Sequence, residues 1–134
     1  MYLVYHPEGS EEPTRWQYNP RKIMSAEREM LERRTGRTFS EFTQDVIKGG
    51  SLARRALLFM FLKRDTPGVR FDDVDFAWDE LTLEHSKAEL QEIRADAADR
   101  MTGDERAAVL AQLDSEIAEA HEEPEGKVLP PVVA

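Results

Sequence analysis

The chain has 134 residues, of which 40% are apolar and 34% are charged, and its formal net charge is −9 at pH 7. This length suits one domain with its own core, and the composition is typical of a helical protein with long solvated faces. Cysteine is absent, which excludes a disulfide framework, a thiolate nucleophile and a thiolate zinc site, and favours an intracellular protein.

The charges are divided unevenly along the chain. Residues 1–70 carry 13 basic and 9 acidic side chains and residues 71–134 carry 5 and 18, so that +4 and −13 sum to −9. The basic excess is scattered over several segments, and the acidic half repels phosphate backbones. We therefore expect no nucleic acid partner.

The N-terminal residues predict a β-hairpin. Tyr2–Tyr5 and Thr14–Tyr18 are rich in strand-forming residues, and the sequence His-Pro-Glu-Gly-Ser follows the first of them, which is typical of a turn. Trp16 and Tyr18 alternate along the second strand, so they share a face and supply the apolar surface on which the hairpin docks. The first residues also lack the basic and long apolar regions of a secretory signal.

Two helices are predicted next. Apolar residues recur at helical spacing over 23–35, and Gly36 provides the stop. Thr38 and Glu41 have the spacing of a capping box, which begins a second helix. The apolar stripe of that helix consists of Phe39, Phe42, Val46 and Ile47, and Gly49 with Gly50 ends it.

A third helix is predicted from Ser51, as its cap, to about Arg64. Its run Ala56–Leu62 is apolar on every side, which predicts a central helix with neighbours on most faces. A membrane span needs roughly 20 apolar residues, so this run does not predict one.

After the turn at Pro67, the chain is expected to be extended with one short turn. Thr82 is expected to cap a fourth helix from Leu83 to about Met101, and Thr102 with Glu105 has the pattern of a second capping box, for a last helix to about Glu122. These two helices have narrow apolar seams, which we interpret as self-association surfaces. The self-association residues are Leu90, Ile93, Leu110, Leu113 and Ile117.

The predicted fold is therefore mainly α, with about five helices and a short N-terminal β-hairpin. We expect a hairpin and helical core domain over residues 1–80, an acidic helical hairpin over 81–122, and a flexible tail over 123–134.

The acidic cluster around residue 75 is the main candidate for chemistry. It contains Asp72, Asp73, Asp75, Asp79, Glu80, Glu84 and His85. Its spacing is not that of a calcium loop, and acids placed near a helix start complement the helix dipole instead. The basic pairs Arg54–Arg55 and Lys63–Arg64 could form a patch for an acidic partner, but they lie at the two ends of one helix, so the more economical interpretation is that they face Asp72 to Asp79 within the chain.

The sequence has no Gly-x-Ser-x-Gly and no Gly-rich phosphate loop, and its three histidines have no ligand spacing. We therefore expect no catalytic residue, no cofactor and no metal. A metal-dependent enzyme that uses Asp72, Asp73, Asp75 and Glu84 is the alternative from the enzyme class.

Five aromatic residues near loops are candidates for partner binding, because large aromatic side chains commonly anchor interfaces. They are Trp16, Tyr18, Phe71, Phe76 and Trp78. The alternative is that these rings close the core around the central helix.

Several of these segments together resemble one family. In order they are Trp16-x-Tyr18-x-Pro20, Thr35-Gly36-Arg37-Thr38-Phe39-x-Glu41-Phe42, Gly49-Gly50-Ser51, Ala56-Leu57-Leu58-Phe59-x-x-Leu62-Lys63-Arg64 and Phe71-Asp72-Asp73-Val74-Asp75-Phe76. Over residues 14–85 the chain resembles the tail assembly chaperones of long, flexible-tailed bacteriophages, especially those that infect actinobacteria. The resemblance is one of order and spacing rather than of a single diagnostic motif.

The resemblance implies a small helical, non-catalytic protein that acts in the host cytoplasm and is absent from the mature virion. Its partners would be the tape-measure protein, which it would keep soluble while tail-tube protein subunits polymerise around it, and further copies of itself in a homo-oligomer. A structural virion component, such as a connector or tail-completion subunit, is the alternative among binding proteins.

The resemblance also implies a frameshifted longer form of the chain as a partner. Gly126-Lys127 lies near the end of the chain, and these residues encoded as GGA-AAA or GGA-AAG after a preceding G would form a slippery heptamer. We hypothesise that the ribosome shifts there. A GGC codon at position 126 would contradict this hypothesis.

Overall fold

The computed structural model describes residues 1–122, which form two compact units. The larger unit is Tyr2–Leu83, and the smaller unit contains Met1 and the described residues from Glu84 onward. No helix among these residues is long and apolar enough to span a bilayer.

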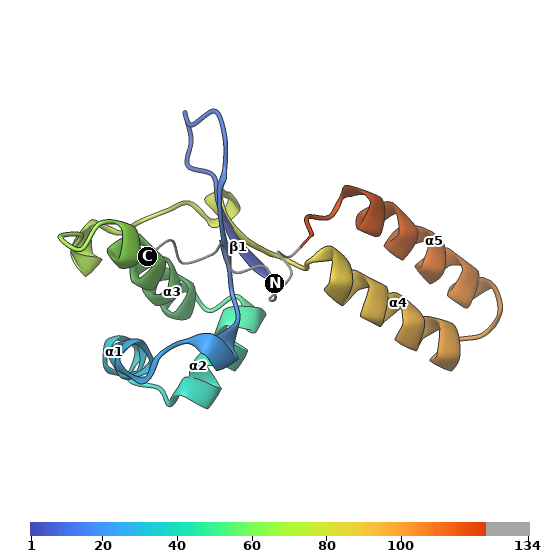
Figure 1. Cartoon of the computed structure of the whole chain (residues 1–134), viewed down its shortest axis with the longest axis horizontal. Coiled ribbons are helices and arrows are strands. Elements are labelled where there is room, and N and C mark those ends of the chain that lie inside the picture. Colours follow the sequence, from blue (N-terminus) through green and yellow to red (C-terminus); the bar gives the residue numbers. More distant parts are fainter. Residues whose placement is uncertain (123–134) are drawn as a thin grey trace, which may run out of the picture. The chain divides into compact units, whose positions relative to one another are not determined.

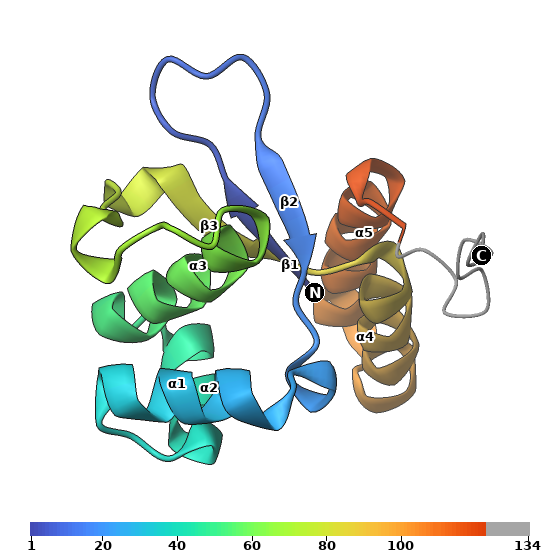
Figure 2. The same ribbon diagram turned by 60° about the vertical axis from the view of Figure 1, so that its left-hand side comes forward.

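A three-stranded sheet is built around the first strand. β1 (Tyr2–Tyr5) lies between β2 (Thr14–Gln17) and β3 (Leu81–Glu84). β1 and β2 are antiparallel, with Leu3 opposite Trp16, and Figure 2 shows the long loop that joins them. The predicted hairpin is confirmed.

The third strand differs from the prediction, which placed a helix cap at Thr82 and a helix from Leu83. Leu81 is buried while Thr82 is exposed, which is the alternation of a strand with one face on the core. The predicted cap at Thr82 is therefore wrong, and β1 gains a second neighbour.

Three helices form the rest of the larger unit: α1 (Ser25–Thr35), α2 (Phe39–Lys48) and α3 (Ser51–Asp65). A short turn, η1 (Pro20–Lys22), precedes α1, so that helix begins two residues later than predicted. The three helices pack against one another (Figures 1 and 2).

The predicted helix ends are confirmed at two positions. Gly36 follows α1 with φ +67°, a left-handed conformation that glycine adopts without steric cost. Before α2, the Thr38 hydroxyl accepts from the Glu41 N–H at 3.2 Å, and the Glu41 carboxylate accepts from the Thr38 N–H at 3.1 Å. The N-cap of α3, however, is Gly50 and not Ser51.

The predicted central helix is confirmed. Ala53 and all residues from Ala56 to Phe61 in α3 are buried. Side chains from the sheet, from α1 and α2 and from the segment after α3 complete the core, with Leu3, Leu31, Phe42, Val46, Val74 and Leu81 almost fully buried. The segment after α3 contains two short turns, η2 (Phe71–Asp73) and η3 (Trp78–Glu80), where one was expected.

The smaller unit is a helical hairpin of α4 (Lys87–Arg100) and α5 (Gly103–Glu119), drawn in gold to red in Figure 1. Ser86 caps α4, because its hydroxyl accepts from the Glu89 N–H at 3.2 Å and its own N–H donates to the Glu89 carboxylate at 2.9 Å. The side chain of Thr102 makes no capping hydrogen bond, so the second predicted capping box is wrong.

The described residues therefore contain five α-helices and a small sheet, as the predicted fold class requires, with one strand more than expected. The predicted tail over 123–134 and the Gly126-Lys127 pair lie outside the described residues.

Candidate protein-binding surface

The five aromatic candidates divide into packed rings and one exposed ring. Trp16 is half-buried and stacks on Phe61 of α3, with 5.4 Å between ring centroids and 12° between ring planes. Phe71 is half-buried and meets Phe59 edge to face at 5.4 Å. Their positions fit the interpretation in which the rings close the core.

Tyr18 is buried, with only 3% of the residue accessible to solvent, which fits the interpretation in which the rings close the core and not the one in which Tyr18 binds a partner. Its hydroxyl has no hydrogen-bond partner among the described residues. Burial raises the pKa of Tyr18 to about 12, because the phenolate would lose its hydration inside the protein. Tyr18 is therefore a core residue in this structure.

Trp78 is the exposed ring, with 65% of its surface accessible, while Phe76 is half-buried. Trp78 begins η3 and rests against the connection between α2 and α3. A Cβ atom placed on Gly49 would lie 2.8 Å from Cη2 of the Trp78 ring, so the absence of a side chain at Gly49 allows this close approach. Gly49 also has φ +84°, which disfavours any other residue there.

Arg54 also contacts the indole. Its guanidinium carbon lies 5.5 Å from the centre of the Trp78 ring, a cation–π distance. Its Nε donates to the Val46 carbonyl at 3.0 Å, near the end of α2. Burial lowers the pKa of Arg54, since a partly desolvated cation is less stable than a hydrated one. Trp78 is thus held in place although most of its surface faces solvent.

Two further exposed apolar residues lie near Gly49 in the sequence. Ile47, in the last turn of α2, is 55% exposed, and Leu52, in the first turn of α3, is 46% exposed. The described residues have five exposed large apolar side chains, and three of them lie in or against the junction between α2 and α3. We call Ile47, Leu52 and Trp78 the Trp78 surface.

Sequence reasoning had assigned Ile47 to the buried stripe of its helix and had not considered Leu52. The distinction was available for Ile47, because Phe42 and Val46 are four residues apart and define the buried face of α2. A residue directly after Val46 projects about 100° away from that face. Leu52 directly precedes Ala53, the first buried residue of α3, so its side chain projects from a different side of the helix.

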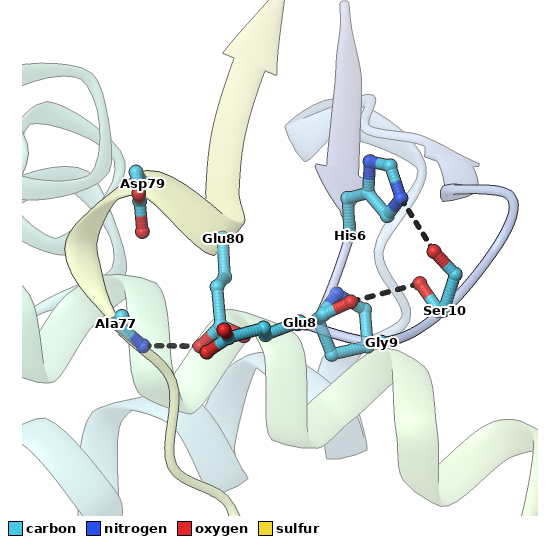
Figure 3. A pocket seen from close by; sticks show the side chains of 8 residues that line it. His6, Glu8, Gly9, Ser10, Ala77, Asp79 and Glu80 are labelled. Carbon is cyan, nitrogen blue, oxygen red and sulfur yellow. Dashed lines mark hydrogen bonds between the residues drawn. The ribbon is translucent and has the colours of Figure 1, made fainter.

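A carboxylate fixes the turn that carries Trp78. Glu80 accepts from the Ala77 N–H and from the Glu8 N–H, both at 2.6 Å, and these hydrogen bonds lower the pKa of Glu80. Figure 3 shows the Ala77 N–H directed at the Glu80 carboxylate beside the loop that follows β1. The Glu80 carboxylate therefore connects the turn that carries Trp78 to the loop between β1 and β2.

The hollow in Figure 3 has a volume of about 410 Å³ and contains His6, Ser10, Asp79 and Glu80 among its lining residues. His6 Nε2 lies 3.0 Å from the Ser10 carbonyl oxygen, and the Ser10 hydroxyl donates to the Pro7 carbonyl at 2.9 Å. These polar groups are engaged in shaping the loop. We infer that the hollow is a product of the loop's hydrogen bonds.

The acidic cluster does not form a cation site in the described residues, because no three of its potential ligands come together in a metal-binding arrangement. This includes Asp72, Asp73, Asp75 and Glu84, the residues of the metal-dependent alternative. Asp73 pairs with Arg70 at 3.1 Å on the surface. The structure therefore gives that alternative no ligand set.

Of the two basic pairs, Arg55 and Arg64 bind groups outside the acidic cluster, whereas Lys63 lines the same hollow as Asp72. Arg55 donates to the carbonyl oxygens of Val74 and Phe71, at 2.6 and 3.0 Å. Arg64 forms a two-bonded ion pair with Glu27 of α1, with both distances 2.7 Å. Arg55 thus binds the segment after α3 through backbone carbonyls, and Arg64 binds α1 through a carboxylate that is not part of the acidic cluster.

The five predicted self-association residues have different environments. Leu90 and Leu113 are buried, with 7% and 8% of their surfaces exposed, Leu110 and Ile117 are half-buried, and Ile93 is 40% exposed. Arg94 and Asp114 join α4 to α5 by hydrogen bonds of 2.5 and 3.3 Å. Of the five, Ile93 is therefore the residue best placed to meet another chain.

The geometry thus singles out the exposed apolar residues around Trp78. No protein-family model, curated protein or solved structure matches the chain.

Proposed function

We propose that this chain is a non-catalytic tail assembly chaperone of a long-tailed phage, which binds the tape-measure protein and keeps it soluble while tail-tube subunits polymerise around it. The observation that carries the proposal is the Trp78 surface, an exposed apolar site on a chain with a net charge of −9. The resemblance over residues 14–85 supplies the identity of the partner.

The rigidity of Trp78 supports a role in binding. An indole held by Gly49 and Arg54 loses little conformational freedom when a partner covers it. Tryptophan is among the residues that contribute most to binding when an interface buries them. The Trp78 surface therefore suits the apolar stripe of a helical partner, such as the long helices of a tape-measure protein.

The acidic exterior supports the chaperone part of the proposal. A protein that covers an apolar chain in many copies must itself remain dispersed, and a net charge far from zero opposes aggregation. The described residues from Glu84 to Glu122 carry 11 acidic and 4 basic side chains, a difference of −7. This acidic segment would keep the complexes apart in the host cytoplasm.

The residues that resemble the family also account for the helical unit that presents Trp78. Gly36 ends α1, the Thr38–Glu41 capping box begins α2, and Gly49 lies against the Trp78 ring. We therefore attribute the resemblance to a shared framework. The homo-oligomer and a longer frameshifted form remain parts of this proposal.

Co-expression tests the proposed function. The tape-measure protein encoded in the same genome should be soluble and should co-purify with the wild-type chain, and should aggregate without it. The Trp78→Ala chain should lose this effect, whereas Met24→Ala, which changes a 72% exposed apolar side chain outside the Trp78 surface, should retain it. Equal solubility with and without the chain would refute the proposal.

Mass spectrometry of purified virions separates the chaperone from the alternative virion component. The chaperone proposal expects no stoichiometric amount of the chain in the finished particle. Its presence there at a fixed copy number would favour a connector or tail-completion subunit.

A further inference from the structure

A second feature of the larger unit is a cluster of three cations around the rings of Phe59 and Phe71. Lys63 Nζ lies 5.6 Å from the centre of the Phe59 ring, and the guanidinium carbon of Arg34 lies 5.4 Å from the same ring. Arg34 is also 4.9 Å from the centre of the Phe71 ring, and Arg55 is 4.3 Å from it. Three positive charges are thereby gathered around two rings.

Two of these cations have no carboxylate partner within residues 1–122. Arg55 is engaged by backbone carbonyls, and other arginines of the chain have acids: Arg37 pairs with Asp45 and Arg64 with Glu27. Among the described residues, the charged groups of Arg34 and Lys63 contact the rings alone. A cation–π contact uses the positive charge but occupies no N–H donor, so the donors of Arg34 and Lys63 remain available.

These donors border a hollow of about 320 Å³. Its lining includes both phenylalanine rings, Val69, and the three cations Arg34, Lys63 and Arg70. Such a volume accommodates a side chain rather than a large cofactor. The rings and Val69 offer apolar contact to a carbon stem, and the cations offer charge to its end.

The remaining lining residue, Asp72, bears on the charge of the ligand. A doubly charged phosphate would be repelled by Asp72 more strongly than a singly charged carboxylate would be. A carboxylate and a phosphate both match the planar, two-pronged donor set of an arginine, so the charge of Asp72 is what favours the carboxylate. The hollow is therefore better suited to a carboxylate on a short carbon stem.

We propose that the hollow bounded by Arg34, Lys63, Phe59 and Phe71 binds a glutamate or aspartate side chain of an acidic peptide segment in a partner protein. Arg34 supplies the paired N–H donors, Lys63 supplies a second charge, and the rings contact the methylene groups. This site lies on different residues from the Trp78 surface and stands independently of the proposed function.

A titration of the full chain at low salt tests the site. The probe is acetyl-Glu-amide, its neutral match is acetyl-Gln-amide, and inorganic phosphate is the third ligand. NMR signals of the Arg34 Nε–H and the Val69 methyl groups are followed. Acetyl-Glu-amide should produce saturable shifts at both groups, acetyl-Gln-amide should produce none, and phosphate should bind more weakly than acetyl-Glu-amide.

Variants then identify the donors. Arg34→Gln should weaken binding of acetyl-Glu-amide by about tenfold or more, because it removes charge-assisted hydrogen bonds, and Lys63→Gln should weaken it several-fold. Arg33→Gln is the matched control, since it removes the same charge from the neighbouring position of α1, at a residue that borders a different hollow. It should change the affinity by less than about twofold, because an exposed charge outside the hollow is screened by solvent.

Three results would overturn the proposal. An equal loss in Arg33→Gln and Arg34→Gln would mean that general charge attracts the probe, and stronger binding of phosphate would mean that the ligand is not a carboxylate. The absence of saturable shifts in the wild-type chain would mean that there is no site. Should Arg34→Gln fail to fold by circular dichroism, the Lys63→Gln titration decides, with an unchanged affinity refuting the site.

Discussion

Replacing Trp78 by alanine should weaken partner binding while leaving the chain folded. Trp78 is 65% exposed, so about 35% of its surface is covered. A fully buried tryptophan removes up to about 250 Å² from water, and 35% of this is about 90 Å². At roughly 25 cal/mol per Å², the lost burial amounts to about 2 kcal/mol, and the Arg54 contact adds about 0.5 to 1 kcal/mol.

The free energy of unfolding should therefore fall by about 2 to 3 kcal/mol in Trp78→Ala. Phe42→Ala provides the comparison, because Phe42 is fully buried and its removal should cost about 3 to 5 kcal/mol. Urea denaturation followed by circular dichroism measures both values. A domain with an unfolding free energy of about 5 kcal/mol or more keeps Trp78→Ala folded at 25 °C.

Binding to the purified tape-measure protein, measured by calorimetry, supplies the second half of this test. A central tryptophan in an interface is worth about 2 kcal/mol or more, so the dissociation constant should rise by about 30-fold or more. The reasoning fails if Trp78→Ala destabilises the chain as much as Phe42→Ala does. An unchanged dissociation constant in the folded variant would reject the role of Trp78 in binding.

Three further changes have defined outcomes. Tyr18→Phe should raise the unfolding free energy by about 1 kcal/mol in urea titrations, because it removes a buried hydroxyl without a partner. The wild type should also lose stability relative to this variant between pH 10 and about 12, because the unfolded tyrosine ionises at pH 10 while the folded pKa is about 12; parallel pH profiles would contradict this. Gly49→Ala should cost about 1 to 2 kcal/mol for its left-handed backbone and should shift the Trp78 ring, so a double-mutant cycle with Trp78→Ala should be non-additive, and strict additivity would exclude the contact. If copies of the chain associate through α4, Ile93→Lys should lower the sedimentation mass at equal helix content, because it places a charge in an apolar contact; an unchanged mass would exclude Ile93 from the interface.

Local signals in the sequence were sufficient where both partners of an interaction lie within a few residues. The capping box at Thr38 and Glu41 and the stop at Gly36 were predicted correctly, because each depends on one turn of backbone. The central position of α3 was also predictable, since a helix that is apolar on every side must be covered on most sides.

The start of the smaller unit was mispredicted although its signal was present. The alternation of Leu81, Thr82 and Leu83 has the period of a strand, and Ser86 and Glu89 have the capping-box spacing that begins α4. Thr82 was interpreted as a cap because threonine is common both at caps and in strands. The complete capping box at Ser86 should have decided between the two positions.

The candidate surface depends on distant residues and was less predictable. Trp78 and Tyr18 are both aromatic residues beside loops, yet Trp78 is exposed and Tyr18 is buried. This difference depends on how segments that are distant in the sequence pack together. The hydrogen-bond partners of Arg55 were equally unpredictable from the sequence, because they are the backbone carbonyls of Phe71 and Val74, and every residue type has a backbone carbonyl. The amino-acid sequence therefore does not indicate which backbone carbonyl accepts a hydrogen bond from a given side chain.

The hydrogen bond between Glu8 and Glu80 joins residues that are 72 positions apart, and it has a consequence for synthesis of the chain on the ribosome. β1 is the middle strand of its sheet although it is made first, and its second neighbour consists of residues 81–84. One edge of β1 must therefore stay unpaired until residues 81–84 have been translated. Slow translation between these two segments would prolong the period in which that edge is open to other nascent chains.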